Sequence, residues 1–190
     1  MNAAKELAEE NSSVQGVTIS LASVADRAGL TKPGLMYHFQ TKEELMLGLV
    51  RHFAGQWHER LCAAAGSEPA ELSAFDRHRT YVASLTSSPV ARADFWIYSS
   101  AAYQPLLSVV WQEVFRPWFD VDGVSETARS LLTTARFVAE GAWTAQATGV
   151  FPAEDLGAVR EIALRLVAEA EVSSVASSAD TDAQEPKALA

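Results

Sequence analysis

A stripe of large apolar residues spaced four positions apart constrains this chain most. Its members are Leu45, Leu49, Phe53, Trp57 and Leu61. Residues four apart lie on one face of an α-helix, so the stripe predicts a long helix to about residue 65. Just before it, Thr41-Lys-Glu-Glu44 has the capping-box pattern that begins a helix. A strict four-residue repeat drifts around the helix, so we expect different neighbours along its length.

The rest of the chain also favours helices. Strand-like alternation bounded by hairpin turns is missing from the sequence. A short helix is expected at about residues 3–10, and later ones at about 71–86, 89–103, 105–119, 125–148 and 153–171, with Pro117 kinking or ending its helix. The sequence from 173 to 190 is rich in Ala, Ser and acidic residues without periodicity, so we expect a disordered tail there. The predicted fold class is all-α.

Residues 20–46 have the pattern of a helix-turn-helix. Ser20 is placed to cap a helix that Gly29 ends, and Thr31 is placed to cap a second, short helix that accepts Pro33 in its first turn. The apolar face of the first helix is Leu21, Val24, Ala25 and Ala28. Such a motif places its second helix in the major groove of DNA.

Several side chains of this motif are candidates for DNA contact. With Leu35 and Phe39 facing inward, the outward set is Thr31, Lys32, Pro33, Gly34, Tyr37 and His38. A glycine within a helix costs about 1 kcal/mol relative to alanine, and close approach of DNA would explain Gly34. Lys42 begins a helix, where a bound phosphate would offset the unfavourable dipole. The alternatives are a solvated lysine for Lys42 and ordinary helix-end roles for Tyr37 and His38.

The segment Ser20–Met46, which reads SLASVADRAGLTKPGLMYHFQTKEELM, resembles the DNA-binding domain of TetR-family transcriptional regulators. Residues 30–39 are most similar to multidrug-responsive actinobacterial members. The resemblance implies a homodimer joined through its last two long helices and a ligand pocket in the second domain. It also implies release of operator DNA when ligand binds. We therefore expect a helix-turn-helix domain at 1–46, with Ser20 among its DNA contacts, a helical ligand-binding and dimerisation domain at 47–172, and a disordered tail at 173–190.

The charge distribution agrees with this division. The net charge of −9 disfavours a nucleic-acid-binding protein when the chain is taken as a whole. However, residues 1–60 hold six basic and seven acidic residues, while the rest hold nine basic and seventeen acidic. No acidic residue lies between Arg27 and Lys42. The placement of the charges therefore permits DNA binding at the predicted motif.

Aromatic residues concentrate in the second part of the chain. All but two of them lie between Phe53 and Phe151. Their number favours a site for a flat apolar ligand, although each one alone is more typical of a core. The candidate ligand-binding residues are Trp57, Phe95, Trp96, Tyr98, Trp111, Phe115, Glu140 and Trp143. Glu140 or Asp94 would supply charge for a lipophilic cation, and the alternative for Glu140 is an exposed helix position.

Apolar residues on the last two long helices suit packing between subunits. They are Leu131, Leu132, Ala135, Val138, Ala139 and Ala142, followed by Leu156, Val159, Ile162, Ala163, Leu166 and Val167. Some of them must face the core of their own domain, and the sequence does not divide them. We expect an isologous interface.

Other chemistry is not indicated. There is no nucleophile elbow, phosphate-binding loop or dinucleotide fingerprint, so we expect no catalytic residues, no cofactor and no enzyme activity. His58 and Cys62 are four apart on one helix face, but zinc needs more ligands and no other His or Cys has a telling spacing. We therefore expect no metal site and interpret Cys62 as a small buried apolar residue.

The predicted function is that of a ligand-responsive repressor. A homodimer would bind a palindromic double-stranded DNA operator and leave it on binding a small, lipophilic aromatic or cationic effector. The chain carries no long apolar run and no secretory signal pattern, so we expect a cytoplasmic protein without membrane contact. The alternative is an all-helical small-molecule-binding or catalytic dimer without specific DNA binding.

Overall fold

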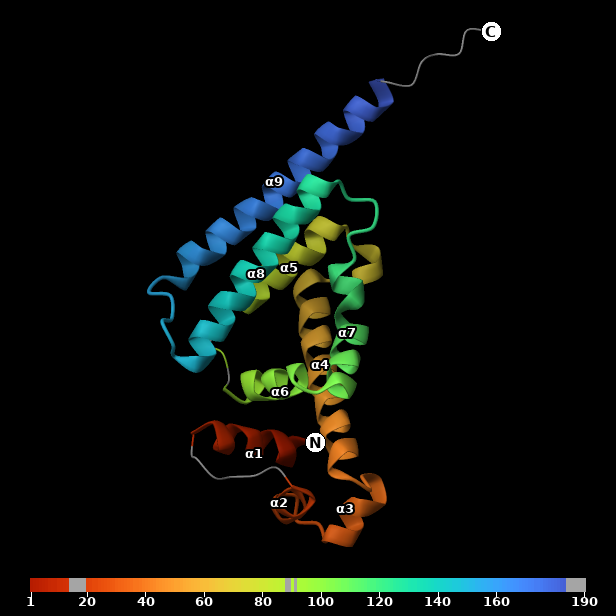
Figure 1. The fold of residues 1–190 in the computed structure, drawn as a ribbon, viewed down its shortest axis with the longest axis vertical. Coiled ribbons are helices and arrows are strands. Elements are labelled where there is room, and N and C mark those ends of the chain that lie inside the picture. The colour runs from red at the N-terminus through yellow and green to blue at the C-terminus, as the bar shows by residue number, and fades with distance from the viewer. Residues whose placement is uncertain (14–19, 88–89, 91, 184–190) are drawn as a thin grey trace, which may run out of the picture. The chain divides into compact units, whose positions relative to one another are not determined.

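Every regular element in the described part of the chain is a helix (Figure 1). The computed structural model describes residues 1–13, 20–87, 90 and 92–183. The elements are α1 (Asn2–Ser13), α2 (Leu21–Arg27), α3 (Lys32–His38), α4 (Lys42–Ala65), the short 3-10 helix η1 (Pro69–Glu71), α5 (Ala74–Leu85), α6 (Arg92–Ala102), α7 (Pro105–Phe119), α8 (Glu126–Thr148) and α9 (Leu156–Ala183). This confirms the all-α prediction. None of the described helices combines the length and the apolar character that a membrane span needs.

Side-chain caps begin the two helices of the predicted motif. The Ser20 hydroxyl accepts a hydrogen bond from the Ser23 backbone N–H at 3.1 Å, and the Ser20 N–H donates to the Ser23 hydroxyl at 2.9 Å. The Thr31 hydroxyl accepts from the Gly34 N–H at 3.2 Å and begins α3. Between the helices, Gly29 has a φ of +65°, the left-handed conformation that glycine adopts without steric cost. The caps and the turn therefore lie where the sequence predicts them.

The helices form two compact units. Unit 1 comprises Met1–Arg60, Pro89–Arg116 and Gln146–Val150, and unit 2 comprises Leu61–Ser88, Pro117–Ala145 and Phe151–Ala190. This division assigns most of α4 to the unit that holds α1, α2 and α3. The reason is the apolar stripe of α4, whose residues from Leu45 to Trp57 are buried within unit 1.

Unit 1 buries residues of α1, α4 and α6. α1 packs on α6, with Ala4, Leu7 and Ala8 buried on α1 and Ile97 and Ala101 buried on α6. Small residues such as alanine let two helices approach closely.

Unit 2 has its core between α5, α8 and α9. α5 packs on α9, with Tyr81, Val82 and Leu85 buried on α5. The buried residues of α8 and α9 are Ala128, Leu132, Ala135, Ala139 and Trp143, then Ala163, Val167 and Ala170. The guanidinium of Arg77 donates to the carbonyls of Pro69, Leu72 and Asp120, at 3.1, 2.8 and 2.6 Å. These bonds attach two connecting segments to α5.

One helix end differs from expectation. The tail expected to be disordered from residue 173 continues as helix α9 to Ala183, and residues 184–190 lie outside the described part. Residues 173–183 contain neither glycine nor proline and several alanines, so a helix already begun at Leu156 continues at little cost. α7 spans the predicted range and ends at Phe119, two residues after Pro117.

A close approach at Gly48 joins the predicted motif to α4. A Cβ atom added at Gly48 would lie 2.8 Å from Cε1 of the Phe39 ring, which is closer than carbon atoms pack. Phe39 is the C-cap residue of α3, so the missing side chain lets the end of α3 rest directly on α4. A Cβ added at Gly55 on the same helix meets nothing within 4 Å.

We predict that Gly48→Ala destabilises unit 1 relative to Gly55→Ala. Both changes raise the helix propensity of α4 equally. The difference between the unfolding free energies of the two variants therefore measures the cost of displacing the Phe39 ring. Overpacking of this kind costs about 1–3 kcal/mol. Urea unfolding of both variants measures the difference, and equal stabilities would show that the Phe39 contact carries no energy.

We predict that acid destabilises the folded chain through His78. This residue is buried against Phe119, and its Nδ1 donates to the Ala74 carbonyl at 2.8 Å. Burial lowers its pKa from the ordinary value of 6.5, aided by the positive charges of Arg136 and Arg77 and opposed by the Ala74 hydrogen bond. Below about pH 6.5 the unfolded chain therefore binds more protons at His78 than the folded chain does, and stability falls as the pH falls. Thermal unfolding between pH 7.5 and 5.5 should show a smaller loss for His78→Phe than for the parent. The exposed His38→Gln serves as the matched control, and an equal loss in His78→Phe would contradict the assignment.

Candidate nucleic-acid interface and effector-binding region

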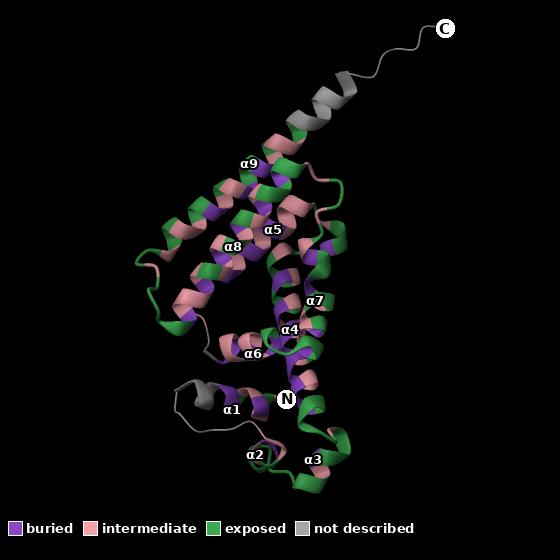
Figure 2. Cartoon of the chain, viewed as in Figure 1, coloured by how far each residue is buried: buried purple, intermediate pink, exposed green. Residues whose placement is uncertain are grey.

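The helix α3 presents most of its side chains to solvent (Figure 2). Leu35 is buried and holds the helix, whereas Thr31, Lys32, Pro33 and His38 are exposed. Tyr37 is 85% exposed, and its ring meets the His38 ring edge-on with centroids 5.3 Å apart. The exposed face of α3 is therefore accessible to another molecule.

The other predicted DNA-contacting residues have local roles as well. Ser20 is half-buried and is occupied in capping α2. Gly34 is half-buried, and a Cβ added there would lie 3.1 Å from the Thr31 hydroxyl. The absence of a side chain at Gly34 thus protects the cap of α3, a reason for glycine that the sequence analysis missed.

Lys42 is the first residue of α4 and is exposed. Two hydrogen bonds of neighbouring residues cap the start of this helix. The Thr41 hydroxyl accepts from the Glu44 N–H at 3.1 Å, and the Glu44 carboxylate accepts from the Gln40 N–H at 2.6 Å. The predicted capping box is therefore present with a shift of one residue, since Glu44 reaches Gln40 rather than Thr41. The ammonium of Lys42 stands beside a helix N-terminus, where phosphate oxygens bind.

Aromatic rings of unit 1 form a stacked cluster around Trp111. Phe53 stacks on Trp111 with centroids 5.7 Å apart, and Phe115 stacks on it at 4.5 Å. Tyr98 meets Trp111 edge-on at 5.3 Å, and Trp57 meets Phe53 edge-on at 6.4 Å. We call these five rings the aromatic cluster. It unites four of the predicted ligand-binding residues and adds Phe53, whose place in the apolar stripe of α4 suggested only a core role.

Polar atoms of α4 lie buried in the same unit. His52 Nε2, Gln56 Oε1 and Trp57 Nε1 are buried, and no hydrogen-bond partner for them is present in the described residues. Buried polar atoms normally have partners, because each one without a partner costs free energy. These three residues lie close together along α4. The sequence pattern did not suggest a polar group there, because the apolar stripe dominates the same helix.

A buried carboxylate is held by two basic side chains. Asp94 on α6 lies 3.6 Å from the Lys5 ammonium of α1 and 3.8 Å from the Arg60 guanidinium of α4. Arg60 also lies over the Trp57 ring, 4.5 Å from its centroid. Asp94 therefore links three helices of unit 1.

The remaining predicted ligand-binding residues lie on α6 and α8. Phe95 and Trp96 are half-buried on α6, and Trp143 is buried on α8 in unit 2. Glu140, also in unit 2, accepts from the Tyr81 hydroxyl at 3.2 Å and lies 3.8 Å from Arg136 Nε. Burial raises the pKa of Glu140, while Arg136 and Tyr81 act against that rise. Glu140 is thus not an exposed helix residue.

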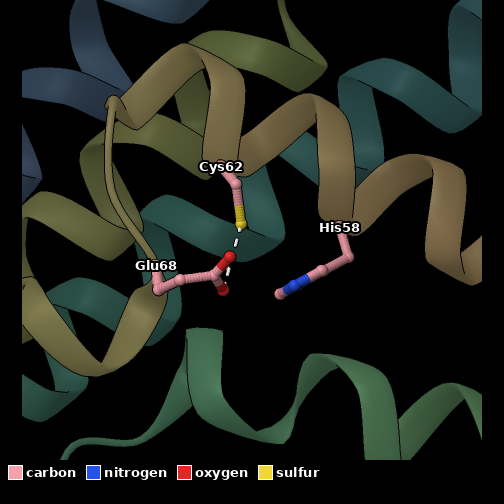
Figure 3. Close-up of side chains that lie close together, drawn as sticks. All are labelled: His58, Cys62 and Glu68. Carbon is pink, nitrogen blue, oxygen red and sulfur yellow. Dashed lines mark hydrogen bonds between the residues drawn. The ribbon is translucent and has the colours of Figure 1, made fainter.

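Cys62 has a polar partner. The residue is half-buried, and its thiol donates to a Glu68 carboxylate oxygen at 3.5 Å (Figure 3). Burial, and then the hydrogen bond to Glu68 and its negative charge, raise the pKa of Cys62 to about 11. The interpretation of Cys62 as a simple buried apolar residue is therefore wrong, because the loop after α4 brings a carboxylate to it.

A capped two-helix motif with an exposed second helix defines a helix-turn-helix DNA-binding protein. Residues 1–49 match the family described as bacterial regulatory proteins, tetR family, and residues 76–168 match the family described as Tetracyclin repressor-like, C-terminal domain. No curated protein matches the chain. The chain therefore belongs to the TetR family. It is a ligand-responsive DNA-binding transcriptional regulator, and proteins of this family are generally not enzymes.

Proposed function

We propose that this regulator is a repressor, a homodimer on a palindromic operator that a small lipophilic aromatic or cationic effector releases. One observation carries the proposal. α4 begins at Lys42, next to the exposed helix α3, and also carries Phe53 and Trp57 of the aromatic cluster. One rigid element therefore belongs both to the DNA-contacting surface and to the effector-binding region. The C-terminal match, described as repressor-like, supports the repressing mode.

On the DNA, α3 lies in the major groove. Lys32 and Tyr37 contact base edges or the adjacent backbone, with Thr31, Pro33 and His38 around them. Gly34 has no side chain, so the start of α3 can approach the DNA closely. Ser20 and Lys42 bind phosphates at the N-termini of their helices. The acidic remainder of the chain repels phosphates, so affinity depends on these few contacts and falls with added salt in proportion to their number.

The effector is a flat aromatic molecule that takes the place of a ring in the stack around Trp111. Stacked aromatic surfaces suit such molecules, and the indole faces attract a cationic group. His52, Gln56 and Trp57 offer hydrogen bonds to polar atoms of the same molecule. Phe95 and Trp96 on α6 extend the apolar surface. This chemistry supports an effector of the multidrug type, as in the actinobacterial members that residues 30–39 resemble.

The dimer forms through exposed apolar residues of α8 and α9. Phe137 on α8 is 57% exposed and Ile162 on α9 is 49% exposed, whereas Leu132, Ala135, Ala139, Ala163 and Val167 are buried within the chain. The structure thus divides the apolar residues of these helices in a way that the sequence did not. Exposed large apolar residues on two long helices favour an isologous interface. Acting on genomic DNA, the dimer would be cytoplasmic.

Coupling follows from population shift. DNA requires two recognition helices about 34 Å apart, one turn of the double helix. An effector that binds more tightly when α4 has another position favours a dimer in which the two recognition helices no longer have this spacing. DNA and effector then weaken each other's binding by the same factor.

A titration of the dimer against its own upstream DNA tests the function. Sequence preference together with salt dependence supports a repressor that binds an operator, whereas ligand binding without sequence preference would favour the helical ligand-binding alternative.

We predict that Lys42→Ala weakens binding about equally on operator and unrelated DNA. The dimer loses one phosphate contact per subunit, two in all, so the slope of log affinity against log salt should fall by about 2. Lys32→Ala should in addition alter sequence preference. Glu43→Ala, at the exposed neighbouring residue, is the matched control and should not weaken binding. An unchanged affinity for Lys42→Ala would refute the phosphate role.

We predict that tetraphenylphosphonium or 2-naphthol quenches the tryptophan fluorescence and releases operator DNA over the same concentration range. Trp111→Phe should lower the affinity for such probes by about 2–10-fold, the value of a lost aromatic contact. Trp118→Phe removes a tryptophan of unit 2 and should leave the affinity unchanged. Quenching at saturation without any change in DNA affinity would contradict the coupling.

A further inference from the structure

Three side chains with metal-binding atoms converge at the end of α4 (Figure 3). His58 and Cys62 are one turn apart on α4, and Glu68 follows in the loop that leads into η1. One ligand atom from each residue lies within 4.8 Å of the other two. All three lie in one short uninterrupted stretch, residues 58–68, so the cluster is a local feature of this helix end.

The loop is built to bring Glu68 back to the helix. Gly66 has a φ of +75°, and its N–H donates to the Cys62 carbonyl at 2.8 Å, which ends α4 and reverses the chain. After the reversal, the Arg77 guanidinium holds the Pro69 and Leu72 carbonyls at 3.1 and 2.8 Å. Glu68 precedes this anchored turn directly, so its position is supported from both sides.

The distances suit a tetrahedral ion. Zinc binds sulfur at about 2.3 Å and oxygen at about 2.0 Å, which puts the two ligand atoms about 3.5 Å apart at the tetrahedral angle. The Cys62 sulfur and the Glu68 oxygen are 3.5 Å apart in the structure. A ring nitrogen of His58 lies within 4.8 Å of both of these atoms.

We propose that His58, Cys62 and Glu68 bind one zinc ion per chain, with the fourth position open to water or to a small ligand. A thiolate together with an imidazole selects zinc and similar transition metals over magnesium and calcium, which prefer oxygen ligands alone. On binding, the Cys62 thiol gives up its proton to solvent and the ion replaces the hydrogen bond to Glu68. Glu68 was not among the predicted ligands, because no helical spacing relates it to His58 and Cys62.

This site goes beyond DNA and effector binding. The DNA-binding assays above do not depend on the metal, so the two proposals succeed or fail separately. The site also has a structural effect: the ion would join α4 to the loop before α5, and binding to the folded state alone raises its thermal stability.

Cobalt absorption of the full-length protein tests the site. Cobalt(II) substitutes for zinc, and its thiolate complex has a sulfur-to-metal charge-transfer band beside tetrahedral d–d bands. We expect both band types at one cobalt per chain, and their loss when zinc displaces the cobalt. We also expect zinc to raise the melting temperature of the parent chain.

Variants assign the ligands. Loss of an outer-shell partner of a metal already costs about 10–100-fold in affinity, so His58→Gln and Cys62→Ser should each lose more than about 100-fold. Glu68→Gln should weaken binding less, because an amide oxygen still coordinates. His38→Gln and Glu59→Gln, at exposed positions, are the matched controls and should bind as the parent does. A parent protein without the charge-transfer band, or binding that survives both His58→Gln and Cys62→Ser, overturns the proposal.

Discussion

The contact between the Phe39 ring and the backbone of α4 at Gly48 fixes the recognition helix. α3 is short and has only Leu35 fully buried, so its own apolar surface holds it weakly. The missing side chain at Gly48 lets the residue that ends α3 rest on α4. The direction in which Tyr37 and Lys32 point therefore follows from α4. The same helix carries two of the clustered rings and three buried polar atoms, so it takes part in both of the proposed binding surfaces.

The sequence predicted best what local interactions determine. The caps at Ser20 and Thr31 and the left-handed turn at Gly29 each involve residues within three or four positions, and all three are present. The approach of Phe39 to Gly48, the bond from Tyr81 to Glu140 and the return of Glu68 to Cys62 join residues that no helical period relates. These contacts depend on how helices pack and loops turn, which the helical pattern of a sequence does not show. The end of α9 was missed for another reason: an acidic, alanine-rich sequence resembles a disordered tail in composition while retaining high helix propensity.

The basic residues of unit 1 fall into two groups, those in ion pairs within the unit and those exposed at its surface, which the net charge of −9 does not distinguish. Arg27 lies 3.6 Å from Glu6, and Lys5 and Arg60 both approach Asp94. These three basic side chains hold helices of unit 1 together. Lys32 and Lys42, in contrast, are exposed at α3 and at the start of α4. Position along the fold, rather than number, decides which positive charges are presented to phosphates.

The continuity of α4 also limits how such regulators can be recombined. A chimera that joined the helix-turn-helix of one relative to the effector domain of another at residues 46 and 47 would separate Leu45 from Leu49 and Phe39 from Gly48. The two residues of each contact would then come from different proteins, and they would not have been selected to pack against each other. Exchange of whole segments up to the end of unit 1 on α4 preserves these contacts, but it carries part of the aromatic cluster along. Operator preference and effector preference in this architecture are therefore expected to be inherited together.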